Sequence, residues 1–291
     1  MIQKLLSSVN FRGKGRLVNM ARSLFLPRDH TIKMKNFPNS NLRFSLNYLW
    51  ADEASKMLWG CPDHLRGDLL FLKSQGPFNG NILDIGANMG LYSLYFSSEL
   101  LKSNYKVYAF EPIQAIFERC HENILLNKAQ DKIKLESFAV HNFTGLAEIQ
   151  LRRDIFNESG ISSFEPIDFP PGQTTVSVTV PVITIDDYCD KNSINNVKLI
   201  KIDVEGNEIN VLEGAKKTIK MDSPAILFEV NKANFNGDYK SALKIYGKFF
   251  EHFNYDIYYQ EQLEKKPIKE AFSLNMVKDG TCGNWWAVKQ S

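Results

Sequence analysis

The stretch Asn81-Ile-Leu-Asp-Ile-Gly-Ala-Asn-Met-Gly90 ("NILDIGANMG") decides the fold of this chain. A short apolar run ends near Asp84, and a turn with Gly86 and Gly90 follows it. Glycine adopts positive φ angles easily and lets the backbone approach another group closely. Open parallel sheets bind their ligands just outside the carboxyl ends of the strands. The stretch therefore indicates either a site for a nucleotide-like ligand or a plain tight turn.

Strand-like and helix-like segments alternate regularly after residue 80. Short apolar runs predict strands at residues 81–85, 106–110, 132–138, 197–203 and 225–230, with two last strands at 255–259 and 285–288. Apolar residues at helical spacing predict helices at residues 91–101, 113–127, 209–219 and 239–253. This alternation is typical of βαβ units around a parallel sheet. We therefore expect an α/β fold.

Two parts of the chain depart from this rhythm. We expect residues 1–79 to form an N-terminal extension or lid, and residues 80–291 to form the main domain. Residues from about 145 to 187 form a β insertion, because residues 146–151 and 175–182 alternate with period two, as pairing antiparallel strands do. Loops at a sheet edge often contact substrates.

Composition excludes several classes of function. The chain has 291 residues, 44% of them hydrophobic, as in ordinary globular proteins. Its formal charge is +2 and it lacks a dense basic run with aromatic residues, so no nucleic-acid partner is expected. The chain contains no run of eighteen apolar residues, so we expect no transmembrane helix. The four cysteines are far apart, which favours a reducing, cytoplasmic compartment.

The first 28 residues carry six basic and no acidic side chains. Apolar residues recur among them at roughly helical spacing. One interpretation is a helix in peripheral contact with an anionic membrane surface. The other is a basic arm or lid that packs on the domain, and both stay open. The sequence does not indicate an oligomeric state.

Two carboxylates distinguish the kind of nucleotide. A dinucleotide fingerprint starting at Gly86 would need glycines at positions 88 and 91, which are Asn88 and Leu91. Asp84 would repel a pyrophosphate but suits an ammonium group. Glu111 ends the second strand, where an acidic residue accepts hydrogen bonds from ribose hydroxyls. Alone, Glu111 is equally an acid at a helix start; with the glycine turn, it favours a nucleoside that carries an amino acid.

The segments "ILDIGANMGLYSLYFS", "VYAFEP", "ITIDDY" and "LIKIDVEGNEINVLEGA", in this order, resemble the FkbM-type family of S-adenosylmethionine-dependent methyltransferases. The resemblance covers roughly residues 80–232. It implies a Rossmann-like seven-stranded methyltransferase sheet with its last strand antiparallel, S-adenosylmethionine as cofactor, and a hydroxyl of a sugar, glycan or related polyhydroxylated natural product as methyl acceptor. The residues that it assigns to the cofactor are Asp84, Gly86, Asn88 and Gly90 (methionine end), Glu111 (ribose), and Ser137, Phe138 and Ala139 (adenine). Pro112, next to Glu111, is a further cofactor-binding candidate.

An alcohol needs a base that takes its proton before it can accept a methyl group. Asp203 and Glu205 follow the fourth strand and Glu229 ends the fifth, so we rank Asp203, then Glu229, then Glu205 as the base. Each also has a structural interpretation: a turn cap for Asp203, helix-dipole compensation for Glu205 and a lysine partner for Glu229. These oxygens could also bind a divalent metal, which is not the favoured interpretation.

The acceptor site is the least defined part of the sequence. Its candidates have the amide and hydroxyl groups that bind polyols: Asn157, Ser159, Ser162 and Ser163 in the insertion, and Asn231 after the fifth strand. The insertion residues are equally well explained as polar loop residues. Other hypotheses for the whole chain are an N- or protein-directed methyltransferase, a dinucleotide-dependent oxidoreductase and a non-catalytic Rossmann-fold partner.

Overall fold

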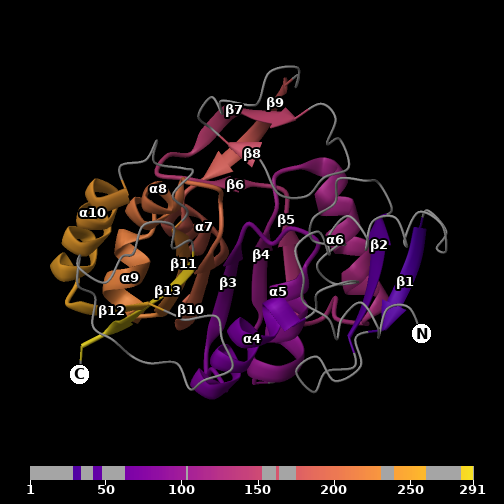
Figure 1. Cartoon of the computed structure of the whole chain (residues 1–291), viewed down its shortest axis with the longest axis horizontal. Helices are drawn as coiled ribbons and strands as arrows, with labels where there is room; N and C mark the ends of the chain where they lie inside the picture. Colours follow the sequence, from indigo (N-terminus) through magenta and orange to yellow (C-terminus); the bar gives the residue numbers. More distant parts are fainter. Residues whose placement is uncertain are drawn as a thin grey trace, which may run out of the picture.

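A computed structural model of the chain describes residues 29–33, 42–47, 63–102, 104–152, 162–163, 175–230, 239–259 and 283–290. A seven-stranded sheet with the order β12-β13-β11-β10-β3-β4-β5 forms its centre (Figure 1). The strands are β3 (Asn81–Ile85), β4 (Val107–Phe110), β5 (Ile133–Glu136), β10 (Val197–Ile202), β11 (Ala225–Val230), β12 (Tyr255–Tyr259) and β13 (Gly283–Lys289). Strands β5, β4, β3, β10 and β11 run parallel to one another, whereas β13 is antiparallel to both β11 and β12. The expected α/β sheet with an antiparallel last strand is confirmed.

Helices cover both faces of this sheet. They are α4 (Asp63–Gln75), α5 (Leu91–Tyr95) with a π-helical turn η1 (Phe96–Leu100), α6 (Gln114–Leu126), α7 (Ile185–Asn192), α8 (Glu208–Glu213), α9 (Lys216–Asp222) and α10 (Tyr239–His252). Side chains of α4, α5, η1 and α6 belong to one buried apolar cluster, and those of α7 to α10 belong to a second. Leu199 lies in the first cluster and Ile200 in the second, as expected when successive side chains of a strand point to opposite faces.

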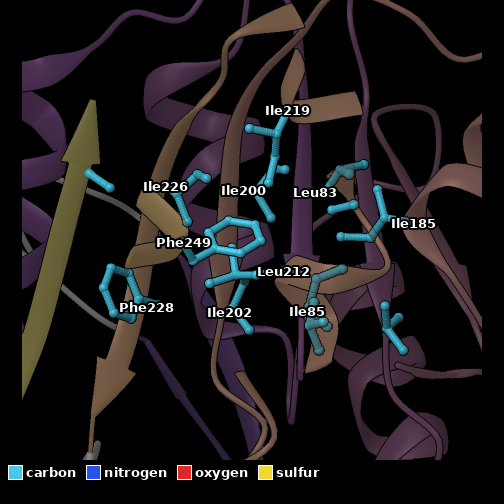
Figure 2. Close-up of a cluster of buried hydrophobic side chains, with 14 of the residues drawn as sticks. Leu83, Ile85, Ile185, Ile200, Ile202, Leu212, Ile219, Ile226, Phe228 and Phe249 are labelled. Carbon is cyan, nitrogen blue, oxygen red and sulfur yellow. The ribbon is translucent and has the colours of Figure 1, made fainter. Parts of the chain in front are cut away.

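The second cluster is built mainly of branched aliphatic and aromatic side chains. Figure 2 shows Leu83, Ile85, Ile200, Ile202, Ile226 and Phe228 of the strands together with Ile185, Leu212, Ile219 and Phe249 of the helices. Ile200 and Ile226 have no exposed surface. Parallel strands that are buried on both faces consist of nearly continuous apolar residues, and this explains why the sequence pattern identified β10 and β11.

A small four-stranded sheet lies beyond the carboxyl ends of the main strands, at the top of Figure 1. It contains β6 (Ala139–Val140), β7 (Gly145–Arg152), β8 (Ser162–Ser163) and β9 (Thr175–Ile183) in the order β6-β9-β7-β8. Strands β7 and β9 are antiparallel, as their alternating residues predicted. The expected end of the insertion was near residue 187, but β9 ends at Ile183 and α7 then packs Ile185 and Tyr188 into the second core cluster.

The expected single helix over residues 209–219 was wrong. The segment forms two helices, α8 and α9, with a break at Gly214 and Ala215. A Cβ atom on Gly214 would lie 2.2 Å from the carbonyl oxygen of His141. The chain therefore approaches the end of β6 closely at this glycine, which periodicity alone does not predict.

The described part of the N-terminal region contains a hairpin and a helix. Strands β1 (Asp29–Lys33) and β2 (Arg43–Asn47) pair antiparallel. Leu69 and Leu72 of α4 are fully buried in the first core cluster, and the Tyr95 hydroxyl donates a hydrogen bond to the Leu69 carbonyl at 3.1 Å. The basic segment 1–28 lies outside the described residues. Among the helices that the structure describes, none is long and apolar enough to cross a membrane.

Truncating Ile200 to alanine tests the central position of β10. We expect Ile200→Ala to lower the free energy of unfolding by about 2–5 kcal/mol, because the lost side chain leaves a cavity in a packed core. The control is Ile245→Ala on α10, where the isoleucine is 54% exposed, and its change should stay within about 0.5 kcal/mol. Denaturant unfolding of both variants measures the difference, and equal losses would contradict this description of the core.

Candidate active site

A pocket opens at the carboxyl ends of three adjacent strands, β3, β4 and β10, where open α/β sheets bind ligands. It comprises about 710 Å³ of space, part of it open to solvent. The lining residues are Ile85, Gly86, Asn88, Phe110, Glu111, Pro112, Ile116, Phe138, Ala139, Val140, Ile149, Asp203, Val204 and Glu205. The structure thus brings residues that the sequence placed at separate strand ends into one pocket.

The turn after β3 is tied to the neighbouring strand by its backbone. The amide groups of Gly86 and Ala87 both donate hydrogen bonds to the Phe110 carbonyl, at 3.1 and 2.9 Å. Gly86, Asn88 and Gly90 have φ angles of 75°, 52° and 87°. This left-handed region strains most residues, but glycine adopts it freely and asparagine tolerates it. The residue types of the turn therefore match its backbone.

The two glycines of the turn allow close contacts inside the protein. A Cβ atom on Gly86 would lie 1.9 Å from the Asp203 carbonyl oxygen. On Gly90 it would lie 2.9 Å from the Cys120 sulfur. The expected reason for these glycines was the close approach of a ligand. Their immediate neighbours are instead other parts of the chain, and Gly86 lines the pocket whereas Gly90 does not, so a ligand contact of Gly90 stays a prediction.

Glu111 lies at the end of β4 with its carboxyl group fixed by backbone donors. Its Oε2 accepts a hydrogen bond from the Asn88 amide and its Oε1 accepts one from the Ile113 amide, each at 3.0 Å. The side chain is 5% exposed. Burial raises the pKa of Glu111 to about 7, although the two backbone donors act in the opposite direction. Each carboxylate oxygen retains a lone pair for a further donor, so Glu111 can bind hydroxyl groups of a ligand.

The wall beyond Glu111 is apolar. Phe138 and Ala139 contribute to it, whereas Ser137 does not line the pocket. The predicted contact of these residues with an adenine stays a prediction. Ile149 of β7 lines it as well, and its side chain packs with Ala139 in a separate buried cluster. The β insertion therefore forms part of the pocket wall, a contribution that was not predicted from the sequence.

Asp84 lies beneath the glycine turn and does not line the pocket. It has no exposed surface, and its Oδ2 accepts a hydrogen bond from the Ser93 hydroxyl at 2.5 Å. Within the described part of the chain its Oδ1 has no hydrogen-bond partner, but this atom lies 3.7 Å from Nζ of Lys201. Burial raises the pKa of Asp84, and Lys201 opposes this effect. A contact between Asp84 and a ligand ammonium stays a prediction.

Lys201 is a buried cation that the sequence analysis missed. It occupies β10 next to Asp84 of β3 and is 5% exposed. Its Nζ donates hydrogen bonds to Oδ2 of Asp203 at 3.0 Å and to the Gly86 carbonyl at 3.2 Å. A lysine within an otherwise apolar strand ("VKLIKID") was the available signal, because lysine is almost never buried without a partner.

Carboxyl groups gather after β10 and β11. Asp203 and Glu205 line the pocket. Glu229 follows Phe228, the register partner of Ile202, so it lies beside Asp203 at the end of the neighbouring strand. The pKa of both Glu205 and Glu229 is raised, first by burial and then by the negative charge of Asp203. The three predicted base candidates thus gather at the carboxyl ends of β10 and β11.

Glu208 is a second residue that was not singled out from the sequence. Its Oε1 accepts hydrogen bonds from the amides of Val204 and Gly206, at 3.2 and 3.1 Å. Glu205, between these residues, has a φ angle of 54°. Burial raises the pKa of Glu208 to about 7. Glu208 therefore fixes the turn that presents Glu205 to the pocket.

The predicted acceptor residues are mostly beyond this description. Asn157, Ser159 and Asn231 lie outside the described residues, and Ser162 and Ser163 form β8, which pairs with β7. Within the described ranges no group of three or more histidine, cysteine or acidic side chains is arranged to hold a metal ion. The roles of Asn157, Ser159, Ser162, Ser163 and Asn231 in acceptor binding stay predictions.

Comparisons with known proteins agree on one kind of enzyme. The "Methyltransferase FkbM domain" family matches residues 84–257. "Hexuronic acid methyltransferase AglP" of Haloferax volcanii is 27% identical over 171 residues, which are 56% of this chain and 62% of that protein. "Methyltransferase sdnD" of Sordaria araneosa is 27% identical over 160 residues, 47% of this chain and 61% of that protein. The chain thus spans less than two thirds of the length of either relative.

A solved structure of a methyltransferase FkbM from Methylobacillus flagellatus aligns with 81% of this chain and 55% of its own length, at 15% identity and a TM-score of 0.44. The family match covers more than half of the chain; it begins near the end of β3 and includes β4, β10 and β11 with their carboxyl ends. On this evidence, the chain belongs to the FkbM methyltransferase domain family.

Proposed function

We propose that this protein is an S-adenosylmethionine-dependent O-methyltransferase whose acceptor is a hydroxyl group of a sugar, glycan or related polyhydroxylated compound. Glu111 is the observation that carries the proposal. It places a fixed carboxyl group between a glycine turn and an apolar wall. A nucleoside with an amino-acid tail has matching parts in the same order: a ribose diol between a polar tail and a flat base.

The described residues fit this cofactor. Phe138, Ala139 and Ile116 would contact the adenine, Glu111 would accept hydrogen bonds from the ribose hydroxyls, and the turn at Gly86 and Asn88 would hold the methionine end. Asp84 lies behind that turn with its Oδ1 3.7 Å from Nζ of Lys201, so it would act on the ligand ammonium through its charge and not through an open contact. When bound, S-adenosylmethionine supplies a methyl group on a positively charged sulfur, an electrophile for an acceptor oxygen.

The chain itself must bind the acceptor and remove the hydroxyl proton. Asp203, Glu229 and Glu205 are the candidates for the base, because they lie together at the ends of β10 and β11 next to the pocket. General-base catalysis of this kind contributes about 10²–10⁴-fold to a rate. Asp203 is favoured, since it lines the pocket and its carboxylate is fixed by a hydrogen bond from Nζ of Lys201 at 3.0 Å.

A sugar-like acceptor is supported by the kind of relative that the chain resembles. The name of the Haloferax volcanii protein states that it methylates a hexuronic acid. The similarity of that protein to this chain is 27% and concerns about half of this chain, so we propose the class of acceptor and not its identity. Transfer of a labelled methyl group to a panel of sugars, glycans and small alcohols will identify it.

Replacing Glu111 tests the cofactor assignment. We expect Glu111→Ala to weaken the binding of S-adenosylhomocysteine about 10- to 100-fold, because hydrogen bonds to a charged group contribute about 1.5–3 kcal/mol. The matched control is Glu251→Ala at an exposed position of α10, which should bind like the parent. Isothermal titration calorimetry measures both. If Glu111→Ala bound as tightly as the parent, the ribose assignment would be wrong.

Replacing Asp203 tests the base. We expect Asp203→Asn to lower kcat for methyl transfer by about 10²–10⁴-fold, while S-adenosylhomocysteine still binds. Asp131→Asn provides the control, because Asp131 is exposed in the turn before β5. A rate for Asp203→Asn within twofold of the parent would remove Asp203 from the list of bases.

A further inference from the structure

We propose that Lys201 is a positioning residue that fixes the direction of the Asp203 carboxylate relative to the glycine turn after β3. This inference rests on the proposed function, because Asp203 needs a fixed direction only if it takes a proton during methyl transfer. Lys201 does not line the pocket. It would therefore act through Asp203 and not through contact with the cofactor or the acceptor.

The side chain of Lys201 contacts three elements around the pocket. Its Nζ donates a hydrogen bond to Oδ2 of Asp203 at 3.0 Å and another to the Gly86 carbonyl at 3.2 Å. Nζ also lies over the ring of Tyr92 in α5, 4.9 Å from the ring centroid, which is within the range of a cation–π contact. The lysine therefore joins the turn after β10 to the turn after β3 and to the helix that follows the latter.

Neutralisation of Asp84 is the competing explanation for a buried ammonium group, which is costly unless it is paired. Lys201 is the register partner of Asp84 in the sheet, and its Nζ lies 3.7 Å from Oδ1 of Asp84. That distance is longer than a hydrogen bond, and Asp84 accepts one from the Ser93 hydroxyl instead. Because the hydrogen bond of the ammonium group goes to Asp203, the geometry favours Asp203 as the group that Lys201 serves.

The cofactor turn and the Asp203 carboxylate depend on Lys201 to different degrees. The amides of Gly86 and Ala87 donate hydrogen bonds to the Phe110 carbonyl, and the cofactor turn would keep both of them without the lysine. The Asp203 side chain is 35% exposed, so packing alone leaves it free to change rotamer. Loss of the Lys201 hydrogen bond should therefore disturb the carboxylate more than it disturbs the cofactor turn.

The direction of the carboxylate has a chemical consequence. The acceptor hydroxyl gives its proton to the Asp203 carboxylate, while its oxygen forms a bond to the methyl carbon and the carbon–sulfur bond breaks with its electron pair on sulfur. The base must therefore face the same hydroxyl that faces the methyl group. A displacement of about 1 Å at such a site can cost about 10²-fold in rate. Lys201 supports that alignment from beneath the pocket wall, where it contacts neither reactant.

A double-mutant cycle in kcat tests whether Lys201 acts through Asp203. We expect Lys201→Met to lower kcat about 10- to 100-fold in the parent protein, because the base loses its alignment. In the Asp203→Asn background the same change should lower kcat less than about threefold, because the group that the lysine positions is already missing. Equal losses in the two backgrounds would mean that Lys201 acts elsewhere, for example on Asp84, and would overturn the inference.

Calorimetry with S-adenosylhomocysteine gives a second readout, which separates the base from the cofactor turn. The Kd of Lys201→Met should stay within about threefold of the parent value while kcat falls, as expected when the lost contact matters only in the transition state. Lys198→Met is the matched control on the same strand, with its amine directed to the Asp222 carbonyl, and it should keep both values. A loss of affinity as large as the loss of kcat would show that Lys201 supports the cofactor turn, and the inference would be wrong.

The possible failures can be told apart. If Lys201→Met does not fold, Lys201→Gln, which keeps an N–H donor but loses the charge, takes its place in the same cycle and is judged by the same criterion. If the parent neither binds S-adenosylhomocysteine nor transfers a methyl group, the proposed function fails and the inference fails with it. An active parent with equal losses in both backgrounds overturns the inference alone.

Discussion

The backbone contact between Gly86 and Asp203 is the constraint on which the rest of the site depends. The missing side chain at position 86 lets the turn after β3 press against the Asp203 carbonyl, and the Asp203 amide donates a hydrogen bond to the Ile85 carbonyl at 3.0 Å. Nζ of Lys201 donates one hydrogen bond to the Gly86 carbonyl and another to the Asp203 carboxylate, so it contacts the turns after β3 and β10. The cofactor side of the pocket and the proposed base are thereby held at a fixed spacing, as a displacement between two reactants requires.

Much of the fold could be predicted because buried parallel strands leave a simple pattern. Strands β3, β10 and β11 are continuous apolar runs, and β7 and β9 alternate with period two, so local sequence identified them. The break at Gly214 could not be predicted, since it depends on the approach of His141, which is more than seventy residues away in the chain. Helix α7 was not predicted for a related reason. Ile185 and Tyr188 are buried by packing against the second core cluster, which is a tertiary contact.

The candidate site likewise has features that the sequence predicted and features that depend on tertiary contacts. Asp84, Glu111 and Asp203 were recognisable because polar residues at the ends of apolar strands meet at one edge of a parallel sheet. What each carboxylate contacts was not recognisable. Ser93 donates a hydrogen bond to Asp84, Lys201 donates one to Asp203, and Glu208 accepts two from the turn after Asp203. All three residues look like ordinary core or helix residues in the sequence. Orientation within a shared pocket is set by tertiary contacts, so the sequence predicted which residues gather there and the structure shows what each of them contacts.

A crystal structure of the protein with S-adenosylhomocysteine tests the central claim most directly. The account predicts that the ribose hydroxyls lie within hydrogen-bond distance of the Glu111 carboxylate, about 2.5–3.0 Å. It also predicts the adenine against Phe138 and Ala139, and the sulfur on the side of the pocket that Asp203 lines. A ligand bound elsewhere, or bound in this pocket with its ribose away from Glu111, would contradict it.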